Sequence, residues 1–454
     1  MMRAFASLLV GGLLCSGCGG EARDLGAELA ALPGVTVEQT ETNLPFYTYY
    51  VLQFTQPVDH DAPGGQTFSQ RVSLVHHDLD VPMVALTSGY HDYYRDRTAE
   101  LTNLVFGNQI SIEHRYFADS RPEPTDWTKL TIEQMAADEH HIIEALRTIY
   151  DVPFLTTGGS KGGMTATYHR RFYPDDVDGT VPYVAPLSFG APDPRYLTFL
   201  DTVGPAACRQ AVREAAIAMI QRRTEMENRA RAQSGHIYTR ISLEAAVESS
   251  IASLDFAFWQ YSGVTACPNV PLPTAADDDL FNFLDATAPI GDSDDAQVAL
   301  FEPYYYQAYQ QLGYPESAAY LEPYLMFEDA DYDGALPTPP PTYDGGAAMR
   351  DIAEFVTTQG SRFLFVYGQW DPWTAGQYEL GGATDSLLVI EPEGTHGARI
   401  NGLAAPDRDA AYDKIEAWTG VRPRAPGAAL ANIGEPVREP HVPPAMIRAL
   451  RARR

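Results

Sequence analysis

The sequence is poor in positive charge, and this shortage excludes one class of partner. Lysine and arginine together number 32 against 60 aspartates and glutamates, so the formal net charge is −28 and the pI is near 4.6. Nucleic-acid binding depends on clustered lysine and arginine. We therefore expect no nucleic-acid partner, whereas the acidic surface suits solubility and favours cationic ligands such as free peptide amino termini.

Long apolar runs are also missing. Beyond residue 18, no segment approaches the roughly 18 apolar residues that a transmembrane helix requires. The first eighteen residues differ from the rest: Arg3 supplies a positive charge, residues 4–14 are apolar but too few to span a bilayer, and Ser16 and Gly17 precede Cys18. This segment predicts a secretory signal.

The end of this signal resembles those of bacterial lipoproteins, in which small residues precede a cysteine that becomes lipidated. Cys18, followed by Gly19 and Gly20, is the candidate lipidation site, while Cys15 stands where that pattern usually has leucine. We expect an exported protein, either a cell-envelope lipoprotein or a simply secreted one. Contact with a membrane would then come only through the N-terminal lipid anchor.

Cysteine is scarce, with four in 454 residues, of which Cys208 and Cys267 follow the predicted signal. In an exported chain two cysteines favour a disulfide over a metal site, because two thiolates without a histidine cluster make a poor zinc tetrad. Two buried free thiols are the alternative. Five histidines also show no ligand pattern with acids and cysteines: His76, His77, His91, His140 and His141. We expect no metal and no organic cofactor.

What the sequence does contain is an alternation of strand and helix patterns. Residues 47–56 and 68–78 alternate in polarity and predict an opening antiparallel hairpin. Buried strands are predicted at 82–90, 108–117, 152–160 and 179–188, and helices at 131–150 and 161–174. The order of these elements implies an α/β fold with a mostly parallel sheet and right-handed crossovers.

At 454 residues the chain exceeds the roughly 250–300 at which a single core stops growing. Residues 191–348 carry long helical patterns without strands and a stretch dense in tyrosine, so we interpret them as a helical cap. This cap is inserted between two parts of the sheet domain, residues 36–190 and 349–420, and residues 421–454 form a tail. The tyrosines either pack helices together or line a substrate cleft.

Residues 158–162 read Gly-Gly-Ser-Lys-Gly and match G-x-S-x-G between a predicted strand and a helix. In that context the motif predicts a nucleophile on a strained turn, with Ser160 as the nucleophile. The backbone N–H of Lys161 would be one oxyanion donor, and Gly89 or Tyr90 would supply the second from the loop after an earlier strand. A structural glycine loop is the alternative.

A serine hydroxyl needs a base, and in this architecture an acid and a histidine follow the serine in that order. Asp371 ends the apolar run that starts at residue 363, and His396 follows the run that starts at residue 387. Both lie where parallel sheets place ligands, at the carboxyl ends of strands. We predict His396 as the general base and Asp371 as the group that orients it. The alternatives are a loop acid and a surface histidine.

Several of these segments resemble a known family: residues 110–122, 130–150, 156–188, 368–376 and 393–400. They are similar to exported serine peptidases related to prolylcarboxypeptidase, and most of all to the secreted bacterial prolyl tri- and tetrapeptidyl aminopeptidases. The resemblance implies an α/β-hydrolase fold and places Ser160, Asp371 and His396 in a catalytic triad. Lys161 stands where the prolylcarboxypeptidase branch usually has tyrosine, which favours the aminopeptidase branch.

The family resemblance implies cleavage after proline, with release of short peptides from a free amino terminus through an acyl-enzyme. Aromatic walls suit the proline ring, and Trp370 and Trp373 are candidates, with packing of their loop as the alternative. Glu113 or the acidic cap would bind the substrate ammonium. A carboxylester hydrolase with the same triad and a non-catalytic, lipid-anchored binding protein remain as alternative functions.

Overall fold

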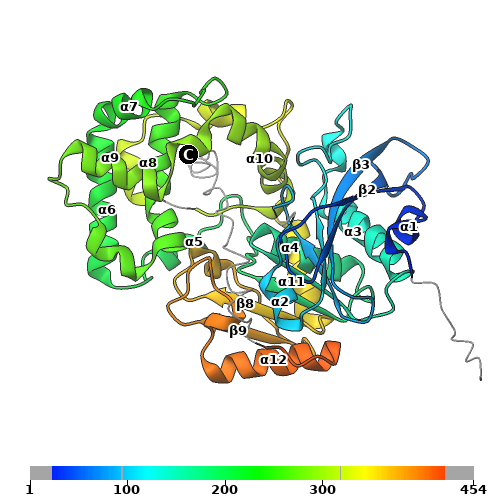
Figure 1. The fold of residues 1–454 in the computed structure, drawn as a ribbon. Helices are drawn as coiled ribbons and strands as arrows, with labels where there is room; N and C mark the ends of the chain where they lie inside the picture. Colours follow the sequence, from blue (N-terminus) through cyan, green and yellow to red (C-terminus); the bar gives the residue numbers. More distant parts are fainter. Residues whose placement is uncertain (1–22, 94–95, 317, 425–454) are drawn as a thin grey trace, which may run out of the picture.

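The centre of the molecule is a nine-stranded sheet with helices on both faces (Figure 1). The computed structural model describes residues 23–93, 96–316 and 318–424. The spatial order of the strands is β1-β2-β3-β5-β4-β6-β7-β8-β9. In chain order they are β1 (Val35–Thr40), β2 (Thr48–Pro57), β3 (Thr67–His76), β4 (Met83–Thr87), β5 (Asn108–Ile112), β6 (Phe154–Gly159), β7 (Gly179–Tyr183), β8 (Leu364–Gly368) and β9 (Leu387–Glu391).

The sheet is antiparallel at one end and parallel over the rest. Strands β1, β2, β3 and β5 pair antiparallel, and the register of β2 with β3 runs from Thr48 opposite His76 to Pro57 opposite Thr67. From β5 through β4, β6, β7 and β8 to β9, every pairing is parallel. The predicted hairpin and the mostly parallel sheet are therefore confirmed, and β1 is an additional edge strand that the sequence pattern did not reveal.

Alternate residues of the parallel strands face different helices. Phe154 of β6 packs with one group of helices, and the next residue, Leu155, packs with another. The first group contains α1 and α3, and the second contains α2 and α12. The helices and single turns around the sheet are α1 (Leu25–Ala30), α2 (Glu100–Val105), η1 (Trp127–Lys129), α3 (Ile132–Arg147), α4 (Lys161–Phe172), α11 (Ala347–Thr358), η8 (Pro372–Gly376), η9 (Ile400–Gly402) and α12 (Ala405–Thr419). This layered arrangement is the α/β-hydrolase fold that we predicted.

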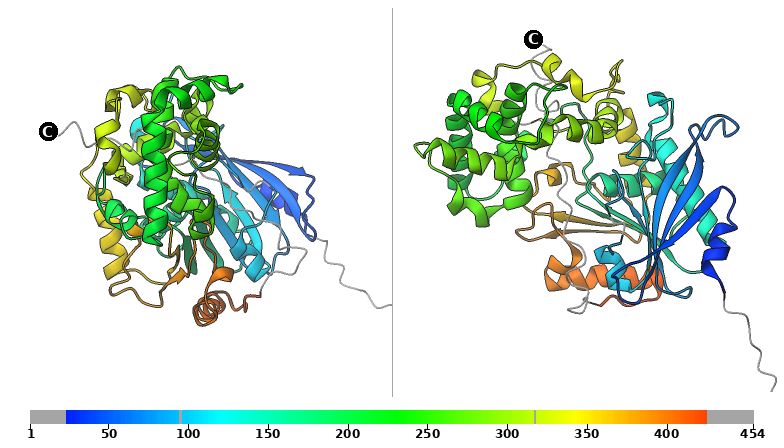
Figure 2. Two further views of the ribbon diagram at one scale, coloured as in Figure 1. Left: turned by 90° about the vertical axis from the view of Figure 1, so that its left-hand side faces the viewer. Right: turned by 45° about the horizontal axis from the view of Figure 1, so that its top comes forward.

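Between β7 and α11 the described part of the chain forms helices and no strand. They gather beside the sheet in a group that Figures 1 and 2 show from three directions. The elements are α5 (Arg195–Leu200), α6 (Ala206–Gln221), α7 (Arg223–Ala232), α8 (Leu243–Ala257), η2 (Phe258–Ser262), η3 (Val264–Asn269), α9 (Asp277–Thr287), η4 (Ile290–Ser293), α10 (Asp295–Gln307), η5 (Ala308–Leu312), η6 (Ala319–Tyr324) and η7 (Asp329–Ala335).

Helix α8 is the centre of this group, because every residue from Ala245 to Ala257 is buried. Around it pack α6, α7 and α9. Cys208 of α6 and Cys267 of η3 are joined by a disulfide, with their Cα atoms 5.5 Å apart. The short element η2, a π-helical turn, continues α8 directly toward the sheet domain.

The predicted secretory signal, the candidate lipidation site Cys18 and the tail from residue 425 onward lie outside the described residues. Within the described ranges no helix has both the length and the apolar character that crossing a membrane would need. The same ranges contain no group of three or more histidine, cysteine or acidic side chains arranged to hold a metal ion.

Candidate active site

Ser160 lies on a sharp turn between β6 and α4. Its φ of 51° and ψ of −123° are strained for a residue with a side chain. The backbone N–H of Ser160 donates to the Tyr183 carbonyl (2.9 Å), and its carbonyl accepts from the Met164 N–H (3.0 Å) in the first turn of α4. These two bonds hold the strained residue at the point where the strand becomes a helix, as the G-x-S-x-G pattern predicted.

The glycines of this turn differ in what they do. A Cβ atom at position 158 would come within 2.6 Å of the Thr87 carbonyl oxygen, and one at position 162 would also collide with that oxygen. Gly158 and Gly162 are therefore required by the close approach of β4 to the turn. Gly159 has open space where its Cβ atom would be, so close packing does not explain it.

Asp371 and His396 form a hydrogen-bonded pair after β8 and β9. The His396 Nδ1–H donates to Asp371 Oδ2 at 2.7 Å, and the Trp373 backbone N–H donates to Asp371 Oδ1 at 3.1 Å. Both side chains are buried, Asp371 completely. With both its oxygens engaged, the carboxylate has a fixed orientation, and it sets the tautomer in which Nε2 is the basic nitrogen of His396.

The sheet brings these residues from distant parts of the chain to one edge. Strands β6, β7, β8 and β9 are parallel neighbours, so their carboxyl ends lie at the same edge. The loops after β8 and β9 are packed against each other, since the Trp370 N–H donates to the Gly394 carbonyl at 2.8 Å. A Cβ atom at Gly368 would lie 2.7 Å from the Gly394 carbonyl carbon, which shows how closely the two loops approach.

The helical insertion reaches the histidine directly. Gln260 of η2 accepts a hydrogen bond from the His396 backbone N–H through its own backbone carbonyl (2.8 Å). The adjacent Tyr261 presents its ring to the His396 ring, with the centroids 6.0 Å apart and the planes nearly perpendicular. Sequence analysis missed both residues, because nothing in the local pattern distinguishes this turn from the end of an ordinary helix.

The candidate oxyanion loop packs against the first turn of α4. Gly89 has a φ of +73°, and a Cβ atom there would lie 2.5 Å from the Gly162 nitrogen. The Lys161 Nζ donates to the Gly89 carbonyl at 2.7 Å. The Tyr90 carbonyl accepts from the His114 N–H at 2.9 Å. The structure thus places Lys161, the first predicted oxyanion donor, beside Gly89 and Tyr90, the two candidates for the second.

Aromatic rings gather on two sides of this region. Trp373 lies 6.3 Å from the His396 ring and packs edge-on against Phe256 of α8 (5.2 Å) and Tyr196 of α5 (5.7 Å). Trp370 is only partly buried and packs near Gly263, which ends η2. On the other side, the Tyr90 ring makes edge contacts with rings of α10, those of Phe301 and Tyr304, both at 5.5 Å.

Glu113 uses its carboxylate within the protein. It is fully buried, Oε2 accepts from the Asp92 N–H at 3.0 Å, and Oε1 accepts from the Ser120 hydroxyl at 2.7 Å. Burial raises its pKa above the ordinary value. This arrangement holds the loop after β4 against the end of β5, and it does not support the predicted contact between Glu113 and a substrate ammonium.

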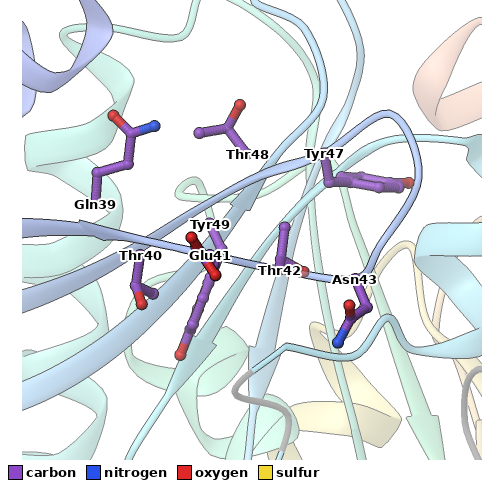
Figure 3. Close-up of a pocket in the computed structure, with 8 residues that line it drawn as sticks. All are labelled: Gln39, Thr40, Glu41, Thr42, Asn43, Tyr47, Thr48 and Tyr49. Atoms are coloured by element: carbon purple, nitrogen blue, oxygen red, sulfur yellow. The ribbon is translucent and has the colours of Figure 1, made fainter.

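A pocket of about 650 Å³ lies at the other end of the sheet, between β1 and β2 (Figure 3). Its lining is mostly polar and consists of Gln39, Thr40, Glu41, Thr42, Asn43, Tyr47, Thr48 and Tyr49. In the strand order three strands, β3, β5 and β4, lie between β2 and β6. The pocket is therefore remote from Ser160, Asp371 and His396. Although it is large, we do not assign it to the substrate of these residues.

Comparison with known proteins agrees with this geometry. The family model described as PS-10 peptidase S37 matches residues 19–432. Prolyl tri/tetrapeptidyl aminopeptidase of Streptomyces mobaraensis is 37% identical over 437 residues, which covers 92% of this chain and 91% of that protein. Human lysosomal Pro-X carboxypeptidase is 30% identical over 185 residues, 35% of this chain and 36% of that protein.

A solved structure, acetyl xylan esterase 1 from a Thermoanaerobacterium species, matches 86% of this chain and 91% of that chain at 11% identity. Its TM-score of 0.39 is too low to support any conclusion, so the fold assignment rests on the strand topology described above. The match of the family model and the 37% identity both extend over almost the whole chain, including the Ser160 turn and the loops of Asp371 and His396. The chain therefore belongs to the PS-10 peptidase S37 family of serine peptidases.

Proposed function

We propose that this protein is an exported serine exopeptidase that hydrolyses the peptide bond after a proline near a free amino terminus. The observation that carries the chemistry is the 2.7 Å hydrogen bond between Asp371 and His396, formed at the sheet edge that also presents the Ser160 turn. The specificity is supported by the Streptomyces relative, whose name describes a prolyl tri/tetrapeptidyl aminopeptidase.

The proposed reaction begins when Ser160 attacks the carbonyl carbon of the proline residue while His396 Nε2 takes the hydroxyl proton. The carbonyl oxygen becomes an oxyanion, which the Lys161 N–H and an N–H of the loop at Gly89 and Tyr90 stabilise. Collapse breaks the C–N bond, and His396 returns the proton to the leaving amine. Water, deprotonated by the same histidine, then hydrolyses the acyl-enzyme and releases the peptide that ends in proline.

We assign the proline ring to the surroundings of Trp373. A proline residue offers a rigid apolar ring and no N–H, so its pocket needs apolar walls more than hydrogen-bond acceptors. Trp373 supplies such a wall next to the His396 ring, and Phe256 and Tyr196 pack edge-on against Trp373. The helical insertion contributes the two rings that hold Trp373 in place, so it supports recognition of the proline ring indirectly.

Recognition of the substrate ammonium is assigned to the acidic helical insertion, because Glu113 is engaged elsewhere. The excess of acidic residues, reflected in the net charge of −28, favours the approach of a cationic amino terminus. A blocked amino terminus should therefore lower the catalytic efficiency even when the proline and the scissile bond are unchanged.

The decisive assay compares three substrates: a tripeptide proline anilide with a free amino terminus, its acetylated analogue, and a simple aryl ester. We expect rapid hydrolysis of the first, slow hydrolysis of the second, and loss of all activity in Ser160→Ala. A fluorophosphonate should label wild-type protein at Ser160 and leave this variant unlabelled. Turnover of the ester alone would replace the peptidase assignment by that of an esterase.

We further propose that the chain is exported and lipidated at Cys18. The support lies in the sequence of the first eighteen residues: Arg3 precedes the apolar residues 4–14, and Ser16 and Gly17 precede the cysteine. Expression with an alkyne-tagged fatty acid should label the wild-type protein and not Cys18→Ser. Unlabelled wild-type protein in the culture medium would instead indicate simple secretion.

A further inference from the structure

The side chain of Lys161 occupies an unfavourable place for a positive charge. Only 2% of the residue is exposed, and it is the first residue of α4, where the helix dipole disfavours a cation. The sequence contains three lysines, and the other two, Lys129 and Lys414, make partly exposed ion pairs with Asp59 and Asp385. Burial of the third lysine beside the nucleophile therefore requires a reason.

The Lys161 ammonium lies close to a backbone carbonyl and two aromatic rings. Its Nζ donates to the Gly89 carbonyl at 2.7 Å and lies 5.6 Å from the ring centroids of both Tyr90 and Phe117. Burial, and next the charge of Lys161, hold the pKa of His114 well below its ordinary value. His114 therefore adds no second positive charge beside Lys161. The buried Glu139 is an acid near the ammonium, and the charge of Lys161 lowers its pKa against the larger raising effect of burial.

The hydrogen bond to Gly89 determines how the next peptide group is oriented. The cis peptide bonds of the described residues all precede proline, so the bond between Gly89 and Tyr90 is trans. In a planar trans peptide the C=O and the N–H point in opposite directions. With the Gly89 carbonyl directed at the ammonium, the Tyr90 N–H points away from it. Because a Cβ atom at Gly89 would lie 2.7 Å from the Lys161 carbonyl carbon, this peptide lies directly beside the Ser160 turn.

Further contacts fix the loop on its other side. The Tyr90 carbonyl accepts from the His114 N–H and from the Ser88 hydroxyl, at 2.9 and 2.6 Å. The Ser88 hydroxyl also donates to the Ile112 carbonyl at the end of β5 (2.8 Å), so this bond and the His114 bond attach the loop to β5, whereas the bond from Lys161 attaches it to α4. Where this loop begins, the Thr87 hydroxyl also donates to the Gly162 carbonyl of α4 (2.6 Å). The Lys161 bond is the side-chain contact from α4 to the Gly89–Tyr90 peptide itself.

We propose that the Lys161 ammonium is a positioning residue, which holds the Gly89–Tyr90 peptide so that the Tyr90 N–H acts as the second oxyanion donor. The inference rests on the proposed role of Ser160 as the nucleophile. A cation bonded to the C=O of an amide also polarises its N–H, so the Tyr90 N–H is a stronger donor than an isolated amide. Lys161 therefore serves the oxyanion twice, through its own backbone N–H and through its side chain.

The test is Lys161→Met, which keeps the length of the side chain and removes the charge and the donor. Removal of a whole oxyanion donor costs about 100- to 1,000-fold in kcat, so loss of its positioning group should cost about 10- to 100-fold. We expect KM for the proline anilide to change by less than about twofold, because the ground-state carbonyl makes weaker use of the donors than the oxyanion does. The affinity for a tripeptide boroproline, whose adduct with Ser160 is tetrahedral, should fall by the same factor as kcat.

Two further variants separate charge from hydrogen bonding. Lys161→Gln can still donate to the Gly89 carbonyl but carries no charge, so we expect an intermediate kcat. Lys161→Arg keeps the charge and should recover part of the lost rate. Lys414→Met, which removes an ion pair on α12, is the matched control and should retain the wild-type kcat. Circular dichroism and the unfolding midpoint show whether each variant is folded.

The outcomes distinguish this inference from the proposed function. The positioning role would be overturned if folded Lys161→Met had the wild-type kcat. It would also be overturned if the variant lost substrate affinity and stability along with kcat. If fluorophosphonate labels Ser160 in the wild type while Lys161→Met is fully active, only the positioning role fails. If the wild type is not labelled at Ser160, the proposed function itself fails.

Discussion

Loss of the Cys208–Cys267 disulfide should lower both the stability of the protein and its catalytic rate. The bond joins α6 to η3 across a sequence separation of 59 residues. In the chain-entropy model, closing a loop of this length stabilises the folded state by about 4 kcal/mol, because the open loop has more conformations in the unfolded chain. Replacing both cysteines by alanine should reduce the free energy of unfolding by about this amount.

The effect on catalysis follows from what precedes η3. The closed loop contains η2, where the Gln260 carbonyl accepts the backbone N–H of His396. Without the disulfide, η3 is no longer tied to α6, and η2 is held less firmly against His396. Weakening this one hydrogen bond, with a net value of about 1 kcal/mol, corresponds to roughly a fivefold loss in kcat.

Urea unfolding measured by tryptophan fluorescence gives the stability, and hydrolysis of the proline anilide gives kcat. The matched control is Arg229→Ala, which removes ion pairs of α7 on the exposed side of the insertion and leaves the disulfide intact. A large loss of stability with an unchanged kcat would refute the link from the disulfide to His396. A loss of stability below about 1 kcal/mol would refute the loop-closure reasoning.

The remaining predictions concern the acid, the turn and a buried carboxyl. Asp371→Asn should keep the fold and lower kcat by about 10⁴-fold, because the wrong histidine tautomer is then favoured; a loss below tenfold in the anilide assay would contradict its orienting role. Gly263→Val should raise KM and lower kcat. Gly263 has a φ of +64°, and a Cβ atom there would lie 3.0 Å from the Trp370 ring and 3.1 Å from the Thr395 methyl group. An unchanged rate of anilide hydrolysis would show that η2 adapts to the new side chain. Burial raises the pKa of Glu139 well above its ordinary value. As the pH rises, Glu139 therefore loses its proton at a lower pH in the unfolded chain than in the folded protein. The free energy of unfolding should fall above pH 4.5 by up to about 1.4 kcal/mol per pH unit, until the pKa of the folded protein is passed. Urea unfolding over a pH series should show a smaller decline in Glu139→Gln, and parallel declines would count against the assignment.

Local sequence signals explain why much of the sheet was predictable. Alternating polarity marks β2 and β3, and short apolar runs mark β4, β6 and β8, because each pattern reflects which faces of the strand are buried. The sequence did not predict strand β1. Residues 35–40 have only two apolar side chains, and they form a strand because each of them pairs with one of residues 49–54 of β2. Pairing between distant segments leaves little trace in a single short segment.

The main residues of the candidate site could also be predicted from the sequence. Ser160 stands in a motif with a local backbone meaning, and Asp371 and His396 follow recognisable strands, so their joint position at the sheet edge follows from parallel topology. The residues that contact them could not be predicted. Gln260 reaches His396 from an insertion 136 residues earlier in the chain, and its sequence surroundings resemble those of any buried helix end.

By itself, the sequence determined the layered α/β architecture, the strained turn at Ser160 and the residues able to act as its acid and base. These depend on backbone geometry and burial within short segments, which composition and periodicity record. Only the tertiary structure decided that Glu113 is engaged inside the protein, that η2 holds His396, and that the Lys161 ammonium is bonded to Gly89. Such contacts join side chains or loops that are far apart in the chain, and their distances are set by how the sheet and the insertion pack.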